Sequence, residues 1–481
     1  MTTTIRDPVF RAIAIGSMTL QNRILRSSIG GKSCNFDGTV TDVWKNFERR
    51  FALGGVAGVI STTFHVDQDR MSPAQYPSIA TDRHMRFLRK FMPEIKGGPY
   101  DCKYIVQIGD PGYVTYSSLF PQSVDGLSAS AGFDLGFGYV NARRAMSDRQ
   151  IERAIDLHIA AAARVREAGA DGVEITASKG YLIHQFLNPA INRRNDDWGG
   201  TPEKRFQFLK RILTGVRARV GLDFPVGVRL SGEDFNGAPW PLALGRWPSP
   251  FLSRERRIGN DISQMKAYAK SLEELGADYL HVTAGFGFPN PRDVPGRFPF
   301  EEVRMFFDSV RHLSTKAAIR AAITHVGPLW AWDWLLNRGW RDDDAPNLGL
   351  SKELKSVVHI PIIANGGFRE VATIRDALHN GGCHMVSMAR ALIATPDFVL
   401  DHLRSDVEVP AGRRCTHCNR CVGRTATSPL GCYEPSRFDY DIQKMEHQIL
   451  AFNAPDEPHD AIAPTPSTLV KQADSVRALQ R

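Results

Sequence analysis

Four cysteines near the C-terminal end of the sequence form its most specific chemical pattern. They are separated by two, two and ten residues and are Cys415, Cys418, Cys421 and Cys432. Close thiol spacing followed by one remote cysteine is typical of a site for an iron–sulfur cluster or for zinc. The remaining cysteines are scattered along the chain, as ordinary thiols are. We therefore expect a metal or cluster site in a reduced compartment rather than a disulfide framework.

A second group of reactive side chains follows the apolar run at residues 172–175. Tyr181 carries a phenol, a weak acid suited to donating a proton to a developing carbanion. Lys179 lies two residues before it and could stabilise an oxyanion or a carboxylate, and Thr176 ends the apolar run. For a single tyrosine, packing is the alternative interpretation.

Polar residues also end other apolar runs. The Gln107 amide can donate and accept hydrogen bonds at once, which suits the edge of a flavin pyrimidine. Arg229 lies within the run VGVRLS, and a buried strand rarely carries arginine without an anionic partner. A flavin that gains negative charge at its N1–C2 edge on reduction would be such a partner. Near Ser28 and Ile29, small residues would let a flat ligand lie against backbone amides.

Two further turns have the composition of a phosphate site. Gly366 and Gly367 follow the apolar run at 361–364, and Ala389 and Arg390 follow the run at 385–388. In a (β/α)8 barrel, the loops after strands seven and eight commonly bind phosphate through backbone N–H groups. Plain turn glycines are the alternative.

The elements that must position these residues alternate between short β-branched runs and longer amphipathic runs. The expected strands are Arg23–Ile29, Val56–Ser61, Tyr104–Ile108, Gly172–Ile175, Pro225–Leu230, Tyr279–Val282, Pro361–Ala364 and Met385–Met388. The expected helices are Asp42–Ala52, Asp148–Glu167, Pro202–Arg219, Asp261–Leu275 and Glu370–His379. This order predicts an α/β fold, a (β/α)8 TIM barrel with the reactive groups at the C-terminal strand ends.

The domain organisation follows from the same pattern. We expect a barrel over residues 1–400, a four-cysteine subdomain over 401–450 and an extended or disordered tail over 451–481. Residues 286–357 form a long insertion after strand six, rich in Trp and Leu. They are interpreted as a helical hairpin packed on the barrel or as a lid, with membrane contact as a third option. Residues 110–147 are expected to form a loop or hairpin.

Composition excludes several classes of protein. The 481 residues are 42% hydrophobic and 23% charged, which is typical of a globular chain rather than a disordered one. No apolar run is long enough to span a membrane, and the start lacks the apolar core of a secretory signal. The net charge of +8 comes without a long basic run, which argues against nucleic-acid binding. We expect a cytoplasmic protein.

Several blocks together resemble the old yellow enzyme family of FMN-dependent NADH:flavin oxidoreductases. They are QNRILRSS, GGVAGVIST, VQIGDPG, GYLIHQFLNPAINRRNDDWGG, VGVRLSGEDF, IPIIANGGF and MVSMARALIATPD, in the family's order over roughly residues 8–400. The resemblance implies that Tyr181 is the proton donor and that Gln107 and Arg229 touch the isoalloxazine. It also implies that Gly367 and Arg390 hold the FMN phosphate.

The four-cysteine block resembles the [4Fe–4S] motif of the 2,4-dienoyl-CoA reductase and trimethylamine dehydrogenase subgroup. That subgroup continues into FAD/NADH domains, of which the residues after Cys432 show no motif. Thr176 and Lys179 stand where many members have a His and an Asn or second His, which argues against simple enone or nitroalkene reduction. Asp110 replaces a common histidine, and Pro289 stands where dienoyl-CoA reductases have a second catalytic His.

Three hypotheses for function follow. The leading one is NAD(P)H-dependent reduction of an activated C=C bond of a small-molecule substrate. Hydride would come from flavin N5 and the proton from Tyr181. The second is oxidation of an amine-type substrate, with electrons leaving through the iron–sulfur cluster to an external electron-transfer protein. The third is a non-catalytic flavin module with zinc at the four cysteines. The resemblance also implies a homo-oligomer, and stable membrane insertion is not expected.

Overall fold

Eight parallel strands form a closed barrel at the centre of the molecule. The computed structural model describes residues 7–71, 75–113, 126–134, 141–236, 259–287, 290–337, 340–425 and 427–454. The barrel strands are β3 (Ile24–Arg26), β4 (Gly58–Ile60), β6 (Lys103–Gly109), β10 (Gly172–Ala177), β11 (Val226–Ser231), β12 (Tyr279–Thr283), β13 (Ile362–Asn365) and β14 (Met385–Met388). Each pairs in parallel with the next, and the pairing of β14 with β3 closes the ring. The predicted TIM barrel is confirmed.

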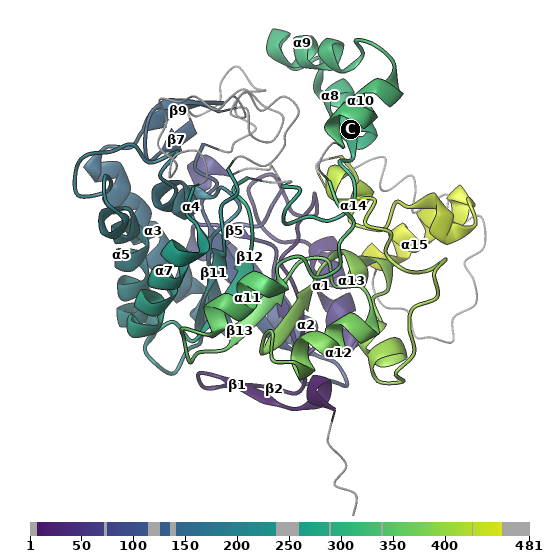
Figure 1. Ribbon diagram of the computed structural model, residues 1–481, viewed down its shortest axis with the longest axis horizontal. Coiled ribbons are helices and arrows are strands. Elements are labelled where there is room, and N and C mark those ends of the chain that lie inside the picture. Colours follow the sequence, from purple (N-terminus) through teal and green to yellow (C-terminus); the bar gives the residue numbers. More distant parts are fainter. Residues whose placement is uncertain are drawn as a thin grey trace, which may run out of the picture.

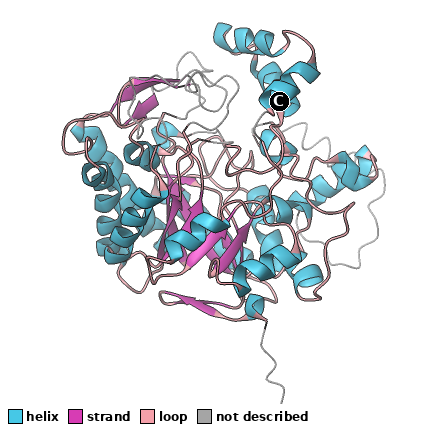
Figure 2. Ribbon diagram, in the orientation of Figure 1, coloured by secondary structure: helices cyan, strands magenta, loops and turns pink. Residues whose placement is uncertain are grey.

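Helices surround this barrel (Figures 1 and 2). They are α1 (Asp42–Leu53), α2 (Asp82–Lys96), α3 (Asp148–Glu167), α5 (Pro202–Val220), α7 (Ile262–Glu274), α11 (Leu348–Lys355), α12 (Val371–His379) and α13 (Arg390–Ala394). The helices α2, α11 and α13 were not among those expected from the sequence. Since α11 lies between β12 and β13 and packs on α7, it belongs to the barrel, although the predicted insertion of 286–357 included it.

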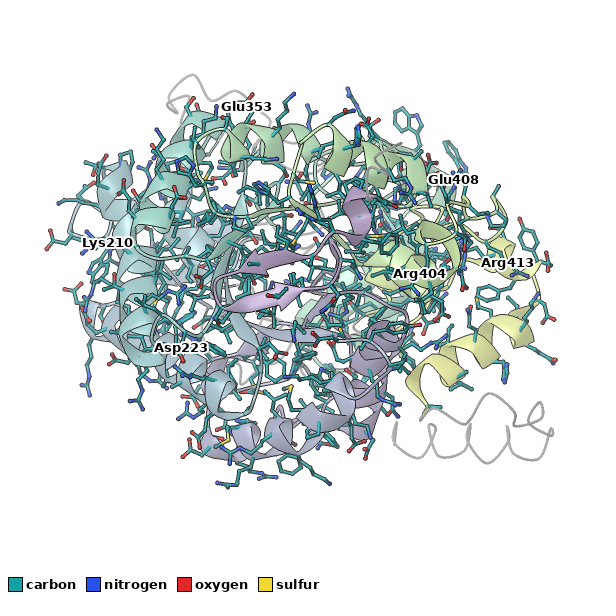
Figure 3. The ribbon with its side chains drawn as sticks, turned by 90° about the horizontal axis from the view of Figure 1, so that it is seen from below. Lys210, Asp223, Glu353, Arg404, Glu408 and Arg413 are labelled. Atoms are coloured by element: carbon teal, nitrogen blue, oxygen red, sulfur yellow. The ribbon has the colours of Figure 1, made fainter. Side chains whose placement is uncertain are left out.

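A short hairpin closes the lower end of the barrel. Its strands are β1 (Ile13–Ile15) and β2 (Met18–Leu20), and it lies across the barrel end in the view from below (Figure 3). Ile15, Met18 and Leu20 are buried in one cluster with side chains inside the barrel, such as Ile105 and Ile363. Apolar burial therefore seals this end, and the reactive groups must work at the opposite end, called here the mouth.

Smaller elements decorate the mouth end. The segment after β6 contains a small sheet of β7 (Gly126–Ser128), β8 (Gly132–Asp134) and β9 (Asn141–Ala145). Its β8–β9 pair is antiparallel, as in a hairpin. Residues 114–125 and 135–140 of the segment lie outside the described residues. The short strand β5 (Phe64–His65) adds to β6, and the short helix α4 (Leu182–Leu187) follows β10.

Three helices after β12 project from the mouth end of the barrel (Figure 1). They are α8 (Phe300–Val310), α9 (Thr315–Thr324) and α10 (Leu329–Leu336). Phe306 and Phe307 of α8 pack on Ala317 and Ala321 of α9 in a small core of their own. The α8 helix also contacts α14 (Arg420–Gly423), which lies within the four-cysteine segment.

The C-terminal part is a small helical unit. A 3₁₀ turn (Pro435–Phe438) and α15 (Ile442–Asn453) share a core with Tyr433, and α15 packs on α1. The tail predicted from residue 451 thus begins inside the last turn of α15, and residues 455–481 lie outside the described residues. Among the helices that the structure describes, none is long and apolar enough to cross a membrane.

Candidate active site

The predicted glutamine lies inside the barrel, with both ends of its amide engaged. Gln107 Nε2 donates to Glu174 Oε1 at 2.7 Å, and Gln107 Oε1 accepts from Ser28 Oγ at 3.0 Å and from the Thr63 hydroxyl. These bonds fix which way the amide faces and leave one of its N–H groups for a ligand. Thr63 and Glu174 were not among the predicted site residues.

Glu174 is the centre of a fully buried polar network. Its Oε2 accepts from Tyr279 Oη at 3.1 Å and lies 3.0 Å from His281 Nδ1, while His281 Nε2 lies 2.8 Å from Ser387 Oγ. Burial opposes ionisation, but His281, Arg229 and the Gln107 bond lower the pKa of Glu174. The network therefore holds a carboxylate beneath the mouth and fixes Gln107 from below.

Arg229 is buried in the barrel wall with an incomplete set of partners. Its Nη2 donates to Asn365 Oδ1 at 3.2 Å, whereas its Nε is buried and has no hydrogen-bond partner in the part of the chain that the structure describes. Burial lowers the pKa of the guanidinium, and Glu174 opposes that shift. An unsatisfied N–H on a buried cation is costly. An anionic or electron-rich edge of a bound ring could accept a hydrogen bond from this N–H group.

Tyr181 lies at the N-terminus of α4, facing strand ends from two other parts of the barrel. A Cβ atom at Gly109 would collide with Thr176 and lie 3.3 Å from Tyr181 Cδ1, so glycine lets these side chains meet. Burial raises the pKa of Tyr181, against the opposing effects of a Thr63 hydrogen bond and of Arg229. The phenol is therefore held protonated, as a proton donor must be.

Lys179 has a left-handed backbone with φ of 59° and forms an ion pair with Asp293, from the segment after β12. Asp293 Oδ1 also accepts from Asn347 Nδ2 at 3.0 Å. Burial and the nearby Arg229 and Arg390 lower the pKa of Lys179 well below its ordinary value. An anionic group of a substrate could replace Asp293 as the partner of Lys179.

Buried side chains of α4 hold the loop between Lys179 and Tyr181. Gly180 N donates to His184 Nδ1 at 3.1 Å, and His184 Nε2 lies 2.8 Å from Asp234 Oδ1. Gln185 Nε2 donates to the Gly180 carbonyl at 2.7 Å. The position of the proton donor is thus set by groups that do not face the mouth.

The predicted phosphate turns lie next to each other at the ends of β13 and β14. Gly366 has φ of 110°, and a Cβ there would lie 2.6 Å from Asn347 Nδ2, so only glycine fits. Ala389 precedes the first residue of α13. Arg390 Nη1 donates to the Pro295 carbonyl at 2.7 Å and to the Asn419 side chain. This arginine therefore joins the mouth to the four-cysteine segment, and its phosphate contact stays a prediction.

The thiols of Cys415, Cys418 and Cys432 lie close enough to Cys421 for their charges to affect it. The four predicted ligands form no disulfide. Burial raises the pKa of Cys421, and negative charge on Cys418, Cys415 and Cys432 raises it further. As placed, no three His, Cys, Asp or Glu side chains of the described residues form a group that could hold a metal ion. His417 Nδ1 lies 2.7 Å from Asp342 Oδ1 and is therefore engaged elsewhere.

The four-cysteine segment lies against the mouth. Leu430 packs on the loop after β3, where a Cβ at Gly31 would lie 2.5 Å from Leu430 Cγ. Arg369, just beyond the β13 turn, donates from Nη1 to the Cys415 carbonyl at 3.3 Å. A redox group at these cysteines would therefore adjoin a ligand bound at the mouth.

Comparison with known proteins shows the family of the chain. Residues 8–238 match the model of the NADH:flavin oxidoreductase / NADH oxidase family. An NADPH dehydrogenase of Geobacillus sp. (strain WCH70) is 30% identical over 298 residues, which cover 61% of this chain and 78% of that protein. The chain belongs to this family.

Two other similarities extend over nearly the whole chain. An N,N-dimethylglycine/sarcosine dehydrogenase of Chromohalobacter salexigens is 30% identical over 459 residues, 93% of this chain and 56% of that protein. The structure of a 2-naphthoyl-CoA reductase complex superposes with a TM-score of 0.68 at 21% identity, over 90% of this chain and 58% of that one. The chain spans about half the length of several such curated relatives.

The described residues fit FMN, the cofactor typical of the NADH:flavin oxidoreductase family. The Arg229 Nε, which has no partner among the described residues, suits the flavin ring edge. The space beside Gly366 is taken by the Asn347 side chain, so a phosphate contact at this turn stays a prediction. For the four cysteines, the all-thiol donor set fits a [4Fe–4S] cluster. Their positions are not those of a closed metal site.

The position at which many family members carry a histidine is occupied here by a buried ion pair. Asp110 Oδ1 accepts from Gly112 N at 2.8 Å, and its Oδ2 pairs with Arg70. Asp110 therefore supports the loop after β6 instead of offering an imidazole to a ligand.

A neighbouring histidine leads to a testable dependence of stability on pH. His65 is fully buried and stacks on Tyr76 with ring centroids 6.2 Å apart, and neither ring nitrogen has a hydrogen-bond partner among the described residues. Burial lowers the pKa of His65 to about 4, against the attraction of Asp110. The ordinary pKa of histidine is 6.5. Above pH 6.5 the ring is therefore neutral in both the folded and the unfolded protein, and the folded state has its full stability there. That stability is lost as the pH falls toward 4.

We expect His65→Phe to remove part of this acid sensitivity. Between pH 7 and pH 4, the wild-type protein should lose about 3 kcal/mol more unfolding free energy than the variant. Urea unfolding at the two pH values measures the difference. An equal loss in both proteins would show that other groups control the acid response.

Proposed function

We propose that the protein reduces an activated C=C bond with NAD(P)H as electron donor and Tyr181 as proton donor. When bound, FMN would supply a hydride from its N5 to the electron-poor carbon. The observation that carries this proposal is the phenol of Tyr181, held protonated by burial and grouped with Thr63 and Arg229 at the mouth. Proton transfer from a positioned weak acid completes the reduction.

Lys179 and Thr176 would bind the group that activates the double bond. Many family members use imidazole and amide side chains there, which suit a neutral carbonyl. A buried lysine that is paired with Asp293 suits a substrate carrying an anionic group or a developing oxyanion, which would replace the carboxylate. This favours an acid or a strongly polarised carbonyl compound over a simple enone.

We further propose that Cys415, Cys418, Cys421 and Cys432 bind a [4Fe–4S] cluster, with zinc as the alternative. The spacing, the all-thiol donor set and the mutual reach of the thiols support it. The contact of Leu430 with the loop after β3 would bring the cluster near FMN. Electrons could then be exchanged with a separate electron-transfer protein.

A second candidate function is oxidation of a methylated amine, with electrons leaving through the cluster. It is favoured by the similarity to an N,N-dimethylglycine/sarcosine dehydrogenase over 93% of this chain. Since the family consists of oxidoreductases, the non-catalytic module is not proposed.

The experiment that separates the two is an anaerobic titration of the purified protein, followed by its visible spectrum. Bleaching of the flavin band by NADPH, followed by reoxidation with an electron-poor alkene, supports the reductase. Stoichiometric bleaching by dimethylglycine or sarcosine without NADPH supports the dehydrogenase instead. A protein that stayed unbleached by both reductants would contradict both proposals.

A further inference from the structure

A chain of buried hydrogen bonds crosses the barrel from Glu174 to Arg229. His281 Nδ1 lies 3.0 Å from Glu174 Oε2, and His281 Nε2 lies 2.8 Å from Ser387 Oγ. Asn365 Nδ2 donates to Ser387 Oγ at 3.0 Å, and Asn365 Oδ1 accepts from Arg229 Nη2 at 3.2 Å. We call these side chains the Glu174–Arg229 network. Each comes from a different barrel strand, so only the closed ring brings them together.

Both side chains that are predicted to touch the flavin ring are attached to this network. Arg229 is its last member, and Gln107 Nε2 donates to Glu174 Oε1 at 2.7 Å at its other end. Glu174, His281 and Ser387 are buried. Polar groups at this depth must keep their partners, because an unsatisfied one would be costly. The network therefore couples the two predicted flavin contacts through the Glu174 carboxylate.

The network holds one carboxylate and one guanidinium that act on each other from a distance. Glu174 pairs with His281 rather than with Arg229. Burial disfavours both charges, but the charge of Arg229 helps to lower the pKa of Glu174, and Glu174 opposes the lowering of the Arg229 pKa. The carboxylate therefore offsets the charge of the guanidinium without occupying its N–H groups. Arg229 Nε, which has no partner among the described residues, can still donate to a ligand.

A glycine on the neighbouring strand makes room for the group that fixes the carboxylate. In the strand register, Gly227 of β11 lies between Glu174 of β10 and Tyr279 of β12. A Cβ atom at Gly227 would collide with the Tyr279 ring. Glycine thus lets this ring cross β11 and place its hydroxyl 3.1 Å from Glu174 Oε2. The carboxylate is therefore held at one position inside the barrel from three sides, by Gln107, His281 and Tyr279.

We propose that Glu174 is a positioning residue that sets the reduction potential of bound FMN by offsetting the charge of Arg229. Reduction places negative charge on the N1–C2 edge of a flavin, and an uncompensated guanidinium there would stabilise the reduced ring. The Glu174 carboxylate weakens this stabilisation and so lowers the potential. The inference rests on FMN binding at the mouth, as the proposed function does. It goes beyond that function, because it concerns the potential and applies to either direction of the reaction.

The test compares the full-length, FMN-loaded protein with Glu174→Gln by anaerobic potentiometric titration. Glutamine keeps the size of the side chain and removes its charge, and His281 can change tautomer to accept from the new amide while its Nε2 donates to Ser387. We expect the reduction equilibrium of the flavin to shift about tenfold toward the reduced form, which is about 30 mV upward for two electrons.

Sulfite binding gives a second measurement that does not involve the four cysteines. Sulfite adds to flavin N5 and leaves negative charge on the same ring edge, so it should bind Glu174→Gln about tenfold more tightly than the wild type. The bleaching of the flavin band by sulfite measures this affinity without any electron donor. A change in the potential of a cluster cannot produce this result.

Tyr279→Phe is the matched control, because it removes a hydrogen bond to Glu174 Oε2 and leaves the charge in place. It should keep the wild-type potential and sulfite affinity. The double variant Glu174→Gln/Tyr279→Phe has one buried polar group fewer and should shift as far as Glu174→Gln, so it provides a second form without the charge. Equal shifts in Tyr279→Phe and Glu174→Gln, or unchanged values in an FMN-loaded variant without the charge, would overturn this inference alone. A wild-type protein that binds no FMN would contradict the flavin site and the proposed function as well.

Discussion

Replacement of Tyr181 by phenylalanine is expected to lower turnover of an activated alkene by about 10²–10⁴-fold, the range for loss of a general acid. Reduction of the flavin by NAD(P)H should continue at its normal rate, because that half-reaction needs no proton from the phenol. Phenylalanine keeps the ring beside Gly109, so the change removes the proton and little of the packing. Stopped-flow measurement of the two half-reactions separates the two effects.

The raised pKa of Tyr181 adds a dependence on pH. Since the protonated phenol is the active form, alkene reduction by the wild type should stay constant through neutral pH. It should fall only above the ordinary tyrosine pKa of about 10. A matched control is Tyr268→Phe, whose hydroxyl donates to the Pro202 carbonyl at 3.1 Å on the outside of the barrel. Equal alkene turnover in Tyr181→Phe and wild type would contradict the assigned role.

The second large effect is expected from Cys421→Ser. Cys421 lies within reach of all three other thiols, so its loss should reduce bound iron and sulfide from about four each per chain to nearly none. The broad absorbance that dithionite bleaches should disappear with them. Iron and sulfide analysis and the visible spectrum before and after dithionite measure this. Cys102→Ser is the control, because Cys102 is buried in the hydrophobic core and its thiol donates to the Lys103 carbonyl, away from the four-cysteine segment.

The same thiols predict how the cluster responds to acid. Burial and neighbouring negative charge raise the pKa of Cys421, and burial raises that of Cys418 to about 12. The cluster-free thiols are then protonated near neutrality, so cluster assembly must release protons and become weaker as the pH falls. Zinc in place of iron would establish the alternative metal, and a full complement of iron in Cys421→Ser would remove this cysteine from the ligand set.

The barrel could be predicted because its signal is local. Each strand is a short apolar run bounded by glycine, proline or polar residues, so β10, β11 and β13 could be recognised without knowledge of their neighbours. The α2 helix was missed although its signal is local, since Met85, Leu88, Met92 and Ile95 recur at helical spacing and are buried. The α11 helix was assigned to the insertion because it has only eight residues and follows directly on the projecting helices.

The candidate site could be predicted only in part, because much of it depends on contacts between distant segments. Gln107, Tyr181 and Arg229 were recognisable as polar residues at strand ends. Glu174 and His281 left a comparable signal, since each is a polar residue inside an apolar strand, but their pairing follows only from the closed ring. The hydrogen bond from Arg390 to Asn419 and the ion pair of Lys179 with Asp293 join loops that are distant in the sequence. The paths of these loops cannot be predicted from their own residues.

The hairpin of β1 and β2 has a consequence for the order of events in turnover. Because Ile15, Met18 and Leu20 fill the lower end of the barrel, the nicotinamide donor and the alkene of the proposed reaction would have to use the same opening. Each would have to leave before the other arrives, so the two half-reactions would alternate. Steady-state kinetics would then show parallel double-reciprocal lines, and an excess of either compound would inhibit by occupying the opening reserved for the other.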